Sequence, residues 1–230
     1  MRTAVVTGAA RGLGRAISER LVADGFAVWA LDTDEAEVGR MADEVGATAC
    51  AIDVTDEAAV DDLAARLGRC DALVNNAAIW RYTPLAETPI DEARRVLAVN
   101  VLGPLLLMQR LVPVMARSEG AAIVNISSIT AKYSPTGAGI YPASKAALEA
   151  LARVWANETA STPLRVNLFN PGPIRTRMRA AVFPGEDPMT LDTPEQAAEF
   201  IVPMCLPSWN ETGKFYDYKT RTLMSFHAPG

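Results

Sequence analysis

The feature that most constrains this chain is a regular alternation of short apolar runs with longer segments of helical spacing. The apolar runs have the length of buried strands, and they occupy residues 3–7, 27–31, 47–52, 71–75, 122–127 and 164–169. The intervening segments have helical length and period, and they occupy residues 13–24, 34–45, 56–67, 91–117 and 141–160. Such alternation predicts βαβ units, and therefore a parallel sheet covered by helices on both faces.

Short right-handed crossovers join such units into a doubly wound, Rossmann-type α/β sheet, whose ligands lie beyond the C-terminal ends of its strands. Because no linker-like stretch interrupts the pattern before residue 170, we expect a single domain over residues 1–230. The pattern loosens after Pro171, where prolines are frequent, and we expect a substrate lid at about 172–193. A helix start at Thr193-Pro194-Glu195 and a last strand at Lys214–Tyr218 complete the predicted elements.

A glycine-rich turn, TGAARGLG at 7–14, follows the first run directly. Its three glycines are Gly8, Gly12 and Gly14, and a helix begins near Leu13. Glycines there let the backbone approach a pyrophosphate, whose charge is met by free N–H groups at the helix N-terminus. Any strand-to-helix turn can use glycine, so the turn taken alone is weak support for a nucleotide site.

Two charged residues near this turn bear on which nucleotide binds. Asp32, at the end of the second run, can accept hydrogen bonds from the adenosine ribose hydroxyls and would repel a 2′-phosphate. Arg11 has the opposite tendency, because it can pair with such a phosphate. Taken singly, each has a plainer interpretation, as a capping aspartate and as a solvated surface charge. We give Asp32 more weight and expect NAD to be preferred, with NADP as the alternative.

Polar residues also follow the later runs. Asp53-Val54 follows the third run, Asn75-Asn76-Ala77-Ala78 the fourth, and Ser127-Ser128 the fifth. The carboxyl ends of parallel strands share one edge of the sheet, where a nucleotide would lie. A Ser128 hydroxyl at that edge can donate to a substrate carbonyl oxygen. The alternative is that these residues only form turns, in which Asp, Asn and Ser are common without any role in binding.

Tyr141 and Lys145 stand four residues apart at the start of a predicted helix, so their side chains share one face. A nearby ammonium stabilises a phenolate and lowers the phenol pKa. Tyrosine can then protonate a developing alkoxide or deprotonate an alcohol. The plainer interpretation is a neighbour pair on an amphipathic helix with no task.

Taken together, these segments resemble the short-chain dehydrogenase/reductase family. TGAARGLG at 7–14 resembles its TGxxxGxG cofactor loop, NNAA at 75–78 its NNAG strand end, and YPASK at 141–145 its YxASK helix. Asn100, ISS at 126–128 and PGPIRT at 171–176 resemble its helix asparagine, its serine strand and its PGxxxT nicotinamide segment. The matches run in family order from residue 3 to about 176.

The resemblance implies a catalytic set of Asn100, Ser128, Tyr141 and Lys145. Tyr141 would be the acid/base, Lys145 would bind the nicotinamide ribose and lower the tyrosine pKa, Ser128 would orient the substrate oxygen, and Asn100 would hold a water in a proton relay. The implied cofactor-binding residues are Gly8, Arg11, Gly12, Leu13, Gly14, Asp32, Asp53, Val54, Asn76, Ala77, Ala78, Tyr141, Lys145, Pro171, Gly172, Ile174 and Thr176. Among these, Asp53 and Val54 would contact the adenine and Thr176 the carboxamide.

The sequence departs from the family pattern in two places. Ala78 replaces the last glycine of NNAG, which costs backbone freedom but removes no functional group. The segment RTRMRAAVFPGEDP at 175–188 is not the usual family ending, so the substrate stays open. Trp80, Arg81 and Tyr82 suit a carbon-rich alcohol or ketone, and Arg175, Arg177 and Arg179 suit an acidic group. The alternative, which is at least as good for both groups of residues, is that they belong to solvated loops with no role in binding.

Composition excludes several other classes. The single histidine, His227, and the three dispersed cysteines at 50, 70 and 205 speak against a metal site or a Ser/His hydrolase. The net charge is −5, and the sequence has no basic stripe that would favour binding of nucleic acid. With no signal-peptide pattern, we expect a cytoplasmic protein. Prolines and polar residues interrupt the apolar segment Val96–Ala116, which predicts a buried helix and no membrane span.

Burial of that helix on both sides predicts a partner subunit, and the family resemblance likewise implies a homodimer or homotetramer. The leading functional hypothesis is an oxidoreductase that interconverts a secondary alcohol and a ketone by hydride transfer with NAD(H), with Tyr141 as general acid/base. An NADPH-dependent carbonyl reductase is the first alternative. A non-catalytic nucleotide-sensing protein is the second, and it would be expected to have a broken catalytic set.

Overall fold

The computed structural model describes residues 1–226, so His227 lies outside the described residues. Within that range eight strands form one sheet in the order β3-β2-β1-β4-β5-β6-β7-β8. The strands are β1 (Arg2–Thr7), β2 (Phe26–Asp32), β3 (Thr48–Ala51), β4 (Ala72–Asn75), β5 (Ala122–Ile126), β6 (Arg165–Asn170), β7 (Lys214–Asp217) and β8 (Thr222–Ser225). All neighbouring strands pair in parallel except β7 and β8. The predicted doubly wound α/β sheet in a single domain is therefore confirmed.

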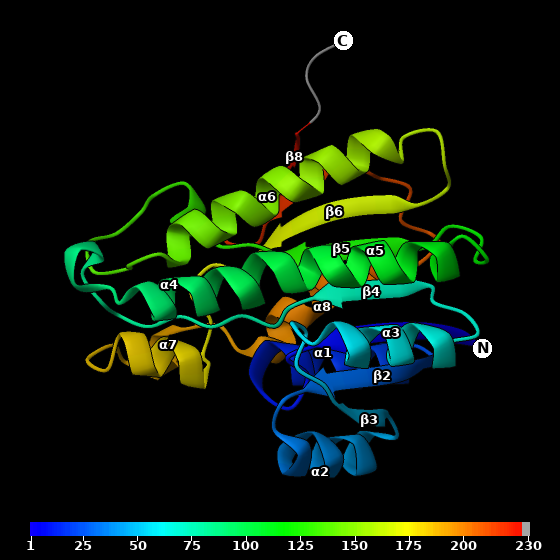
Figure 1. Ribbon diagram of the computed structural model, residues 1–230, viewed down its shortest axis with the longest axis horizontal. Coiled ribbons are helices and arrows are strands. Elements are labelled where there is room, and N and C mark those ends of the chain that lie inside the picture. The colour runs from blue at the N-terminus through cyan, green and yellow to red at the C-terminus, as the bar shows by residue number, and fades with distance from the viewer. Residues whose placement is uncertain (227–230) are drawn as a thin grey trace.

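Helices cover both faces of the sheet (Figure 1). They are α1 (Gly12–Ala23), α2 (Glu35–Val45), α3 (Glu57–Arg66), α4 (Ile90–Leu97), α5 (Gly103–Met115), α6 (Tyr141–Glu158), α7 (Arg177–Val182) and α8 (Pro194–Cys205). Short helical turns are η1 (Leu85–Glu87), η2 (Ala98–Leu102, a π-helical turn), η3 (Ile129–Ala131) and η4 (Pro188–Thr190). Apolar side chains of α1, α2 and α8 pack on one face, and those of α3, α5 and α6 pack on the other.

The sheet reverses its direction of growth between β1 and β4. The chain runs from β1 outward through β2 to β3, then returns to add β4 on the other side of β1. In open α/β sheets a crevice forms at the carboxyl ends of the strands at such a switch point. The helix α7 lies off this edge of the sheet in Figure 1.

Local capping explains where several helices begin. The Asp34 side chain accepts from the Glu37 N–H at the start of α2, and Asp56 does the same for Ala59 at the start of α3. Thr193 and Gln196 form a capping box at α8, with Pro194 in the first turn. The predicted helix start at Thr193-Pro194 is confirmed.

The structure differs from the sequence expectations at two elements. The predicted helix 91–117 is helical from Ile90 to Met115, but the π turn at Ala98–Leu102 divides it. A π turn inserts one residue into the helical repeat, which apolar periodicity does not reveal. The strand β8 was not predicted, because its residues are exposed on an edge and lack a buried pattern. It pairs antiparallel with β7 through a turn in which Arg221 has φ of 56°.

By length and composition, the run Ile90–Met115 is apolar enough to cross a membrane, and half of its most apolar window is buried inside the domain. Its other side is not covered. Leu97, Leu102 and, on α6, Val154 are large apolar side chains that remain exposed.

Candidate active site

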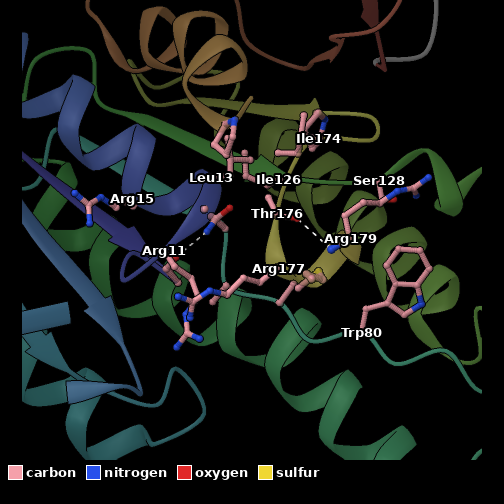
Figure 2. Close-up of a pocket in the computed structure, with 18 of the residues that line it drawn as sticks. Arg11, Leu13, Arg15, Trp80, Ile126, Ser128, Ile174, Thr176, Arg177 and Arg179 are labelled. Carbon is pink, nitrogen blue, oxygen red and sulfur yellow. Dashed lines mark hydrogen bonds between the residues drawn. The ribbon is translucent and has the colours of Figure 1, made fainter. Parts of the chain in front are cut away.

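A cavity of about 1640 Å³ lies beyond the carboxyl ends of the strands. Its lining comes from the turns after β1 to β7 and from the 172–193 segment. This volume exceeds the range of about 300–1,000 Å³ typical of one small-molecule site, and it can hold a dinucleotide together with a substrate. Figure 2 shows part of the lining, with Arg11 and Leu13 on one side and Ser128 and Trp80 on the other.

The turn between β1 and α1 has the backbone that a phosphate cradle needs. Gly8 has φ of 64° and Gly12 has φ of 54°, a region that favours glycine. No side chain caps α1, whose N-cap residue is Arg11, so its first N–H groups are left for a ligand. A Cβ on Gly14 would stand 2.1 Å from the Gly8 carbonyl oxygen. The turn therefore fits the pyrophosphate of a dinucleotide.

The end of β4 holds this turn in place. Asn76 Nδ2 donates to the carbonyl oxygens of Thr7 at 2.9 Å and Gly8 at 3.2 Å. The Thr7 hydroxyl in turn accepts from the backbone N–H groups of Asn76 and Ala77. Since Ala78 follows directly on the cavity wall, the whole segment 76–78 borders the predicted nucleotide site.

The ends of β2 and β3 supply carboxylates to the same region. Asp32 accepts from the Ala10 and Asp34 N–H groups, which fixes its carboxylate beside the glycine-rich turn. Burial would raise the Asp53 pKa, but hydrogen bonds from Thr55 and the Arg95 guanidinium outweigh burial and hold that pKa below its usual range. Asp53 and its neighbour Val54 both line the cavity.

Tyr141, Ser128 and Lys145 meet at the other end of the cavity. Tyr141 is the first residue of α6 and is 7% exposed, and Lys145 is 2% exposed one turn further on. Lys145 Nζ donates to the Ile126 carbonyl oxygen at 2.8 Å, just before Ser128 on the chain. The Ser128 hydroxyl accepts from the Thr130 N–H and from the Thr130 hydroxyl. A partly exposed hydroxyl, a buried phenol and a buried amine are thus gathered at one end of the cavity.

The titration behaviour of this group differs from the sequence expectation. Burial raises the pKa of Tyr141 to about 12, although a hydrogen bond with Ser128 acts in the opposite direction. Burial also lowers the pKa of Lys145 to about 8, while the charge of Glu149 raises it. Lys145 Nζ lies 5.8 Å from the centre of the Tyr141 ring. Desolvation therefore outweighs any stabilisation of the phenolate by the lysine.

Asn100 is fully buried in the π turn and does not line the cavity. Its Oδ1 accepts from the Ile79 N–H at 2.9 Å, and its Nδ2 donates to the Ile79 carbonyl and to the Ser144 hydroxyl, both at 3.0 Å. Both amide hydrogens are thus used within the protein. The side chain ties the end of β4 to α6, the helix that carries Tyr141 and Lys145.

An aromatic stack covers Tyr141. The Trp80 indole lies parallel to the Tyr141 ring, with centroids 4.5 Å apart and planes 8° from parallel. Phe183 meets Trp80 edge-on at 5.7 Å, and the Arg179 guanidinium lies 3.8 Å from the Phe183 centroid. Trp80 Nε1 is buried without a hydrogen-bond partner among the described residues. Arg81 and Tyr82, which the sequence grouped with Trp80, are exposed and do not line the cavity.

The 172–193 segment forms one wall of the cavity, and its two ends are bonded to each other. Ile174 pairs with Asp192 in a short parallel bridge, and the Arg175 N–H donates to the Asp192 carbonyl. Gly172 has φ of 63°, which lets the chain turn away from β6. The Thr176 side chain caps α7, and its Cγ2 lies 3.4 Å from the position of a Cβ on Gly12. Thr176 therefore lies against the glycine-rich turn, and Pro171, Gly172 and Ile174 line the same cavity.

The segment's three arginines are bonded to the protein itself. Arg175 donates to the carbonyl oxygens of Pro188 and Leu191. Arg177 pairs with Glu37, and Arg179 makes a two-point contact with Glu186 at 2.6 and 2.8 Å. The interpretation that they hold an acidic substrate loses its basis, because each guanidinium already has partners.

All the predicted site residues line this cavity except Gly14 and Asn100. Gly14 instead allows close packing of α1 on the turn, and Asn100 holds two elements together. Sequence reasoning did not single out Glu37, Phe183 or Glu149. Phe183 approaches the site only through the folded path of the 172–193 segment, and Glu37 is identified by its contacts with Arg11 and Arg177, neither of which a local pattern reveals. Glu149 had a signal, since it stands one helical turn after Lys145.

A dinucleotide cradle, a buried tyrosine and lysine, and a serine beside them at one crevice define a nicotinamide-dependent oxidoreductase. Comparison with known proteins agrees: residues 2–187 match the model of the short chain dehydrogenase family. A sorbitol dehydrogenase of Cereibacter sphaeroides is 36% identical over 74% of this chain and 70% of its own. The chain belongs to the short-chain dehydrogenase/reductase family and is an NAD(P)-dependent enzyme.

Two solved structures give the same result. A short-chain dehydrogenase of Shigella flexneri complexed with NADP is 30% identical, with a TM-score of 0.88 over 95% of this chain and 97% of its own. A 3-ketoacyl-(acyl-carrier-protein) reductase of Brucella melitensis complexed with NADH is 29% identical, with a TM-score of 0.88 over 94% and 96%. These neighbours bind different nicotinamide nucleotides, so the family alone does not decide between NAD and NADP.

Proposed function

We propose that this enzyme interconverts a secondary alcohol and a ketone by hydride transfer with NAD(H), with Tyr141 as the general acid/base. The observation that carries the proposal is the meeting of Tyr141, Ser128 and Lys145 at one end of the cavity whose other end holds Asp32 and the glycine-rich turn. A bound nicotinamide supplies or accepts the hydride. The 172–193 segment acts as the substrate lid in this proposal.

In ketone reduction, Ser128 donates to the carbonyl oxygen and Tyr141 gives its proton to the alkoxide as it forms. A phenol with a pKa of about 12 stays protonated at neutral pH and is ready to act as an acid. In alcohol oxidation, the same phenol must first lose that proton, and a charged Lys145 favours this step. Lys145 also binds the nicotinamide ribose, and Thr176 binds the carboxamide.

The role proposed here for Asn100 differs from the role that the family resemblance implies. Its two amide hydrogens are committed, so a relay water can donate to its carbonyl oxygen but cannot accept from its side chain. We therefore assign it mainly to holding α6 at the right distance from the end of β4.

NAD is the proposed cofactor because Asp32 occupies the adenosine end and Arg11 is paired with Asp34 and Glu37. Titration of the purified protein with NADH and NADPH tests this assignment directly. We expect tighter binding of NADH, together with turnover of at least one member of a secondary alcohol and ketone panel followed by NADH absorbance. A clear preference for NADPH would overturn our interpretation of Asp32.

The pH dependence of ketone reduction is expected to follow the titration of the Lys145 ammonium. Its pKa of about 8 means that the ammonium is present below that pH and is lost as the pH rises through it. Tyr141 keeps its proton over this range, so kcat/KM should fall above about pH 8 through loss of the lysine charge alone. Lys145→Arg retains the positive charge, and its lower activity should show no such falling limb. A wild-type profile that is flat to pH 9.5, roughly 1.5 units above that pKa, contradicts the role of Lys145.

We also propose a homodimer or homotetramer in the cytoplasm. The exposed apolar side chains Leu97, Leu102 and Val154 support a partner subunit on α4, α5 and α6, and sedimentation velocity tests it through the mass of the particle. The three buried free cysteines support a reducing compartment. The partners in this proposal are a small-molecule alcohol or ketone and further copies of the chain, with no nucleic acid and no membrane.

A further inference from the structure

Four charged side chains join opposite sides of the cavity near the adenosine end. Arg11 comes from the glycine-rich turn, Asp34 and Glu37 from the start of α2, and Arg177 from the first residue of α7. In Figure 2 the Arg11 and Arg177 side chains approach one another from the two sides. Two guanidinium groups repel each other unless an anion lies between them, and that anion is Glu37.

Glu37 contacts both arginines. Its Oε1 accepts from Arg177 Nη1 at 3.0 Å, and its Oε2 lies 2.7 Å from Arg11 Nη2. Asp34 Oδ2 accepts from the same Arg11 nitrogen at 2.9 Å. The Glu37 side chain is only 19% exposed, whereas Arg11 and Arg177 are 43% and 72% exposed. The carboxylate is therefore the sheltered centre of the network.

One oxygen of Glu37 also retains hydrogen-bonding capacity. Oε2 is buried, and no N–H or O–H group of the described residues is aligned to donate to it, although Arg11 is close enough to form an ion pair. Glu37 lines the same cavity as Asp32. A ribose hydroxyl can donate to such an oxygen, whereas a phosphate at the same position has no proton to give and is repelled.

We propose that Glu37 is a second cofactor-selecting residue, which excludes a 2′-phosphate by holding Arg11 and Arg177 in ion pairs. This inference rests on the proposed function, in which the adenosine end of a nicotinamide nucleotide lies at Asp32. Without the Glu37 charge, the Arg177 guanidinium loses its ion-pair partner and Arg11 keeps only Asp34, so both become more available at this end of the cavity. Arginine is well suited to a phosphate, because its planar donors can make two-point contacts.

The test compares nucleotide binding by wild type and Glu37→Gln, measured by isothermal titration calorimetry without any substrate. A hydrogen bond to a charged group contributes about 1.5–3 kcal/mol, which is about tenfold or more in affinity. We expect the ratio of the NADPH Kd to the NADH Kd to fall at least about tenfold in Glu37→Gln. The NADPH affinity of this variant should also decrease more steeply with added salt, as binding by newly freed cations requires.

Glu35→Gln is the matched control. Glu35 lies in the same first turn of α2, so its replacement removes the same charge from the same helix end. It is exposed and does not line the cavity. We expect its Kd ratio to stay within about twofold of wild type. An equal shift in both variants would reveal a general charge effect and would overturn the proposal.

A double-mutant cycle with Arg177→Gln separates the ion-pair explanation from a local structural effect. Arg177→Gln alone should change NADPH binding little, because its charge is already neutralised. In the Glu37→Gln background the same change should remove a measurable part of the gained NADPH affinity. Additive effects, or an unchanged ratio in Glu37→Gln, overturn the proposal while NADH binding by the wild type is intact. A wild type that binds neither nucleotide overturns the proposed function itself.

Discussion

Replacing Tyr141 by phenylalanine is expected to lower kcat/KM at least about 100-fold for any alcohol or ketone that the enzyme turns over. General acid/base catalysis typically contributes a factor of about 10² to 10⁴, and phenylalanine removes the proton donor. The ring itself is retained, so the stack with Trp80 and the packing at the start of α6 should survive. The thermal unfolding temperature should therefore change little, which separates loss of chemistry from loss of structure.

Tyr133→Phe is the matched control for this experiment. Tyr133 is 63% exposed and lies outside the cavity lining, although it is only eight residues before Tyr141 in the chain. Its phenol has no assigned task, so kcat/KM should stay within about twofold of wild type. A fall of less than about tenfold in Tyr141→Phe would show that another group moves the proton.

Gly14→Ala is expected to have the second largest effect, on both stability and nucleotide binding. The added Cβ would stand 2.1 Å from the Gly8 carbonyl oxygen and 2.7 Å from Asn76 Nδ2, so the backbone of the turn must shift. Overpacking of this kind typically costs about 1–3 kcal/mol. Because the displaced turn is the proposed phosphate cradle, NADH affinity should fall as well. Urea unfolding and calorimetric titration measure the two effects.

Gly39→Ala makes the same chemical change and is expected to have the opposite effect on stability. Gly39 lies inside α2, and a Cβ there meets nothing within 4 Å. Alanine is favoured over glycine in a helix by about 0.8–1.0 kcal/mol, so this variant should be more stable than wild type. If Gly14→Ala were stabilising in the same way, glycine at position 14 would not be needed for the close packing of α1 on the turn.

The order of helices and strands could be predicted from sequence because buried parallel strands are rich in apolar residues, although β6 also carries Arg165, Asn167 and Asn170. Strand β6 is buried over all six residues, and its neighbour β5 is buried over all five. The edge strand β8 has no buried residue and gave no such signal. The π turn at Ala98–Leu102 was missed because its own residues and those of α5 after it are largely apolar, so no break in the pattern marks the inserted residue.

The candidate site could be outlined from sequence only where its residues stand close together in the chain. The glycine-rich turn and the pair Tyr141 and Lys145 are local patterns, and they line the cavity as expected. The roles of these residues stay predictions. The direction of the Tyr141 pKa shift could not be predicted, because it depends on burial by side chains such as Trp80. Contacts such as that of Arg177 with Glu37, 140 residues apart, require the folded chain.

The bridge between Ile174 and Asp192 has a consequence for how this enzyme can diversify. The residues between them form a loop whose two ends are already joined, beside the sheet but outside it. Changing the length of such a loop alters its closure entropy only slightly, by about 0.6 kcal/mol for each doubling. The part of the loop that follows α7 can therefore change in length and sequence, while the strands that cradle the nucleotide keep their register. New substrates become accessible to such a scaffold without refolding its core.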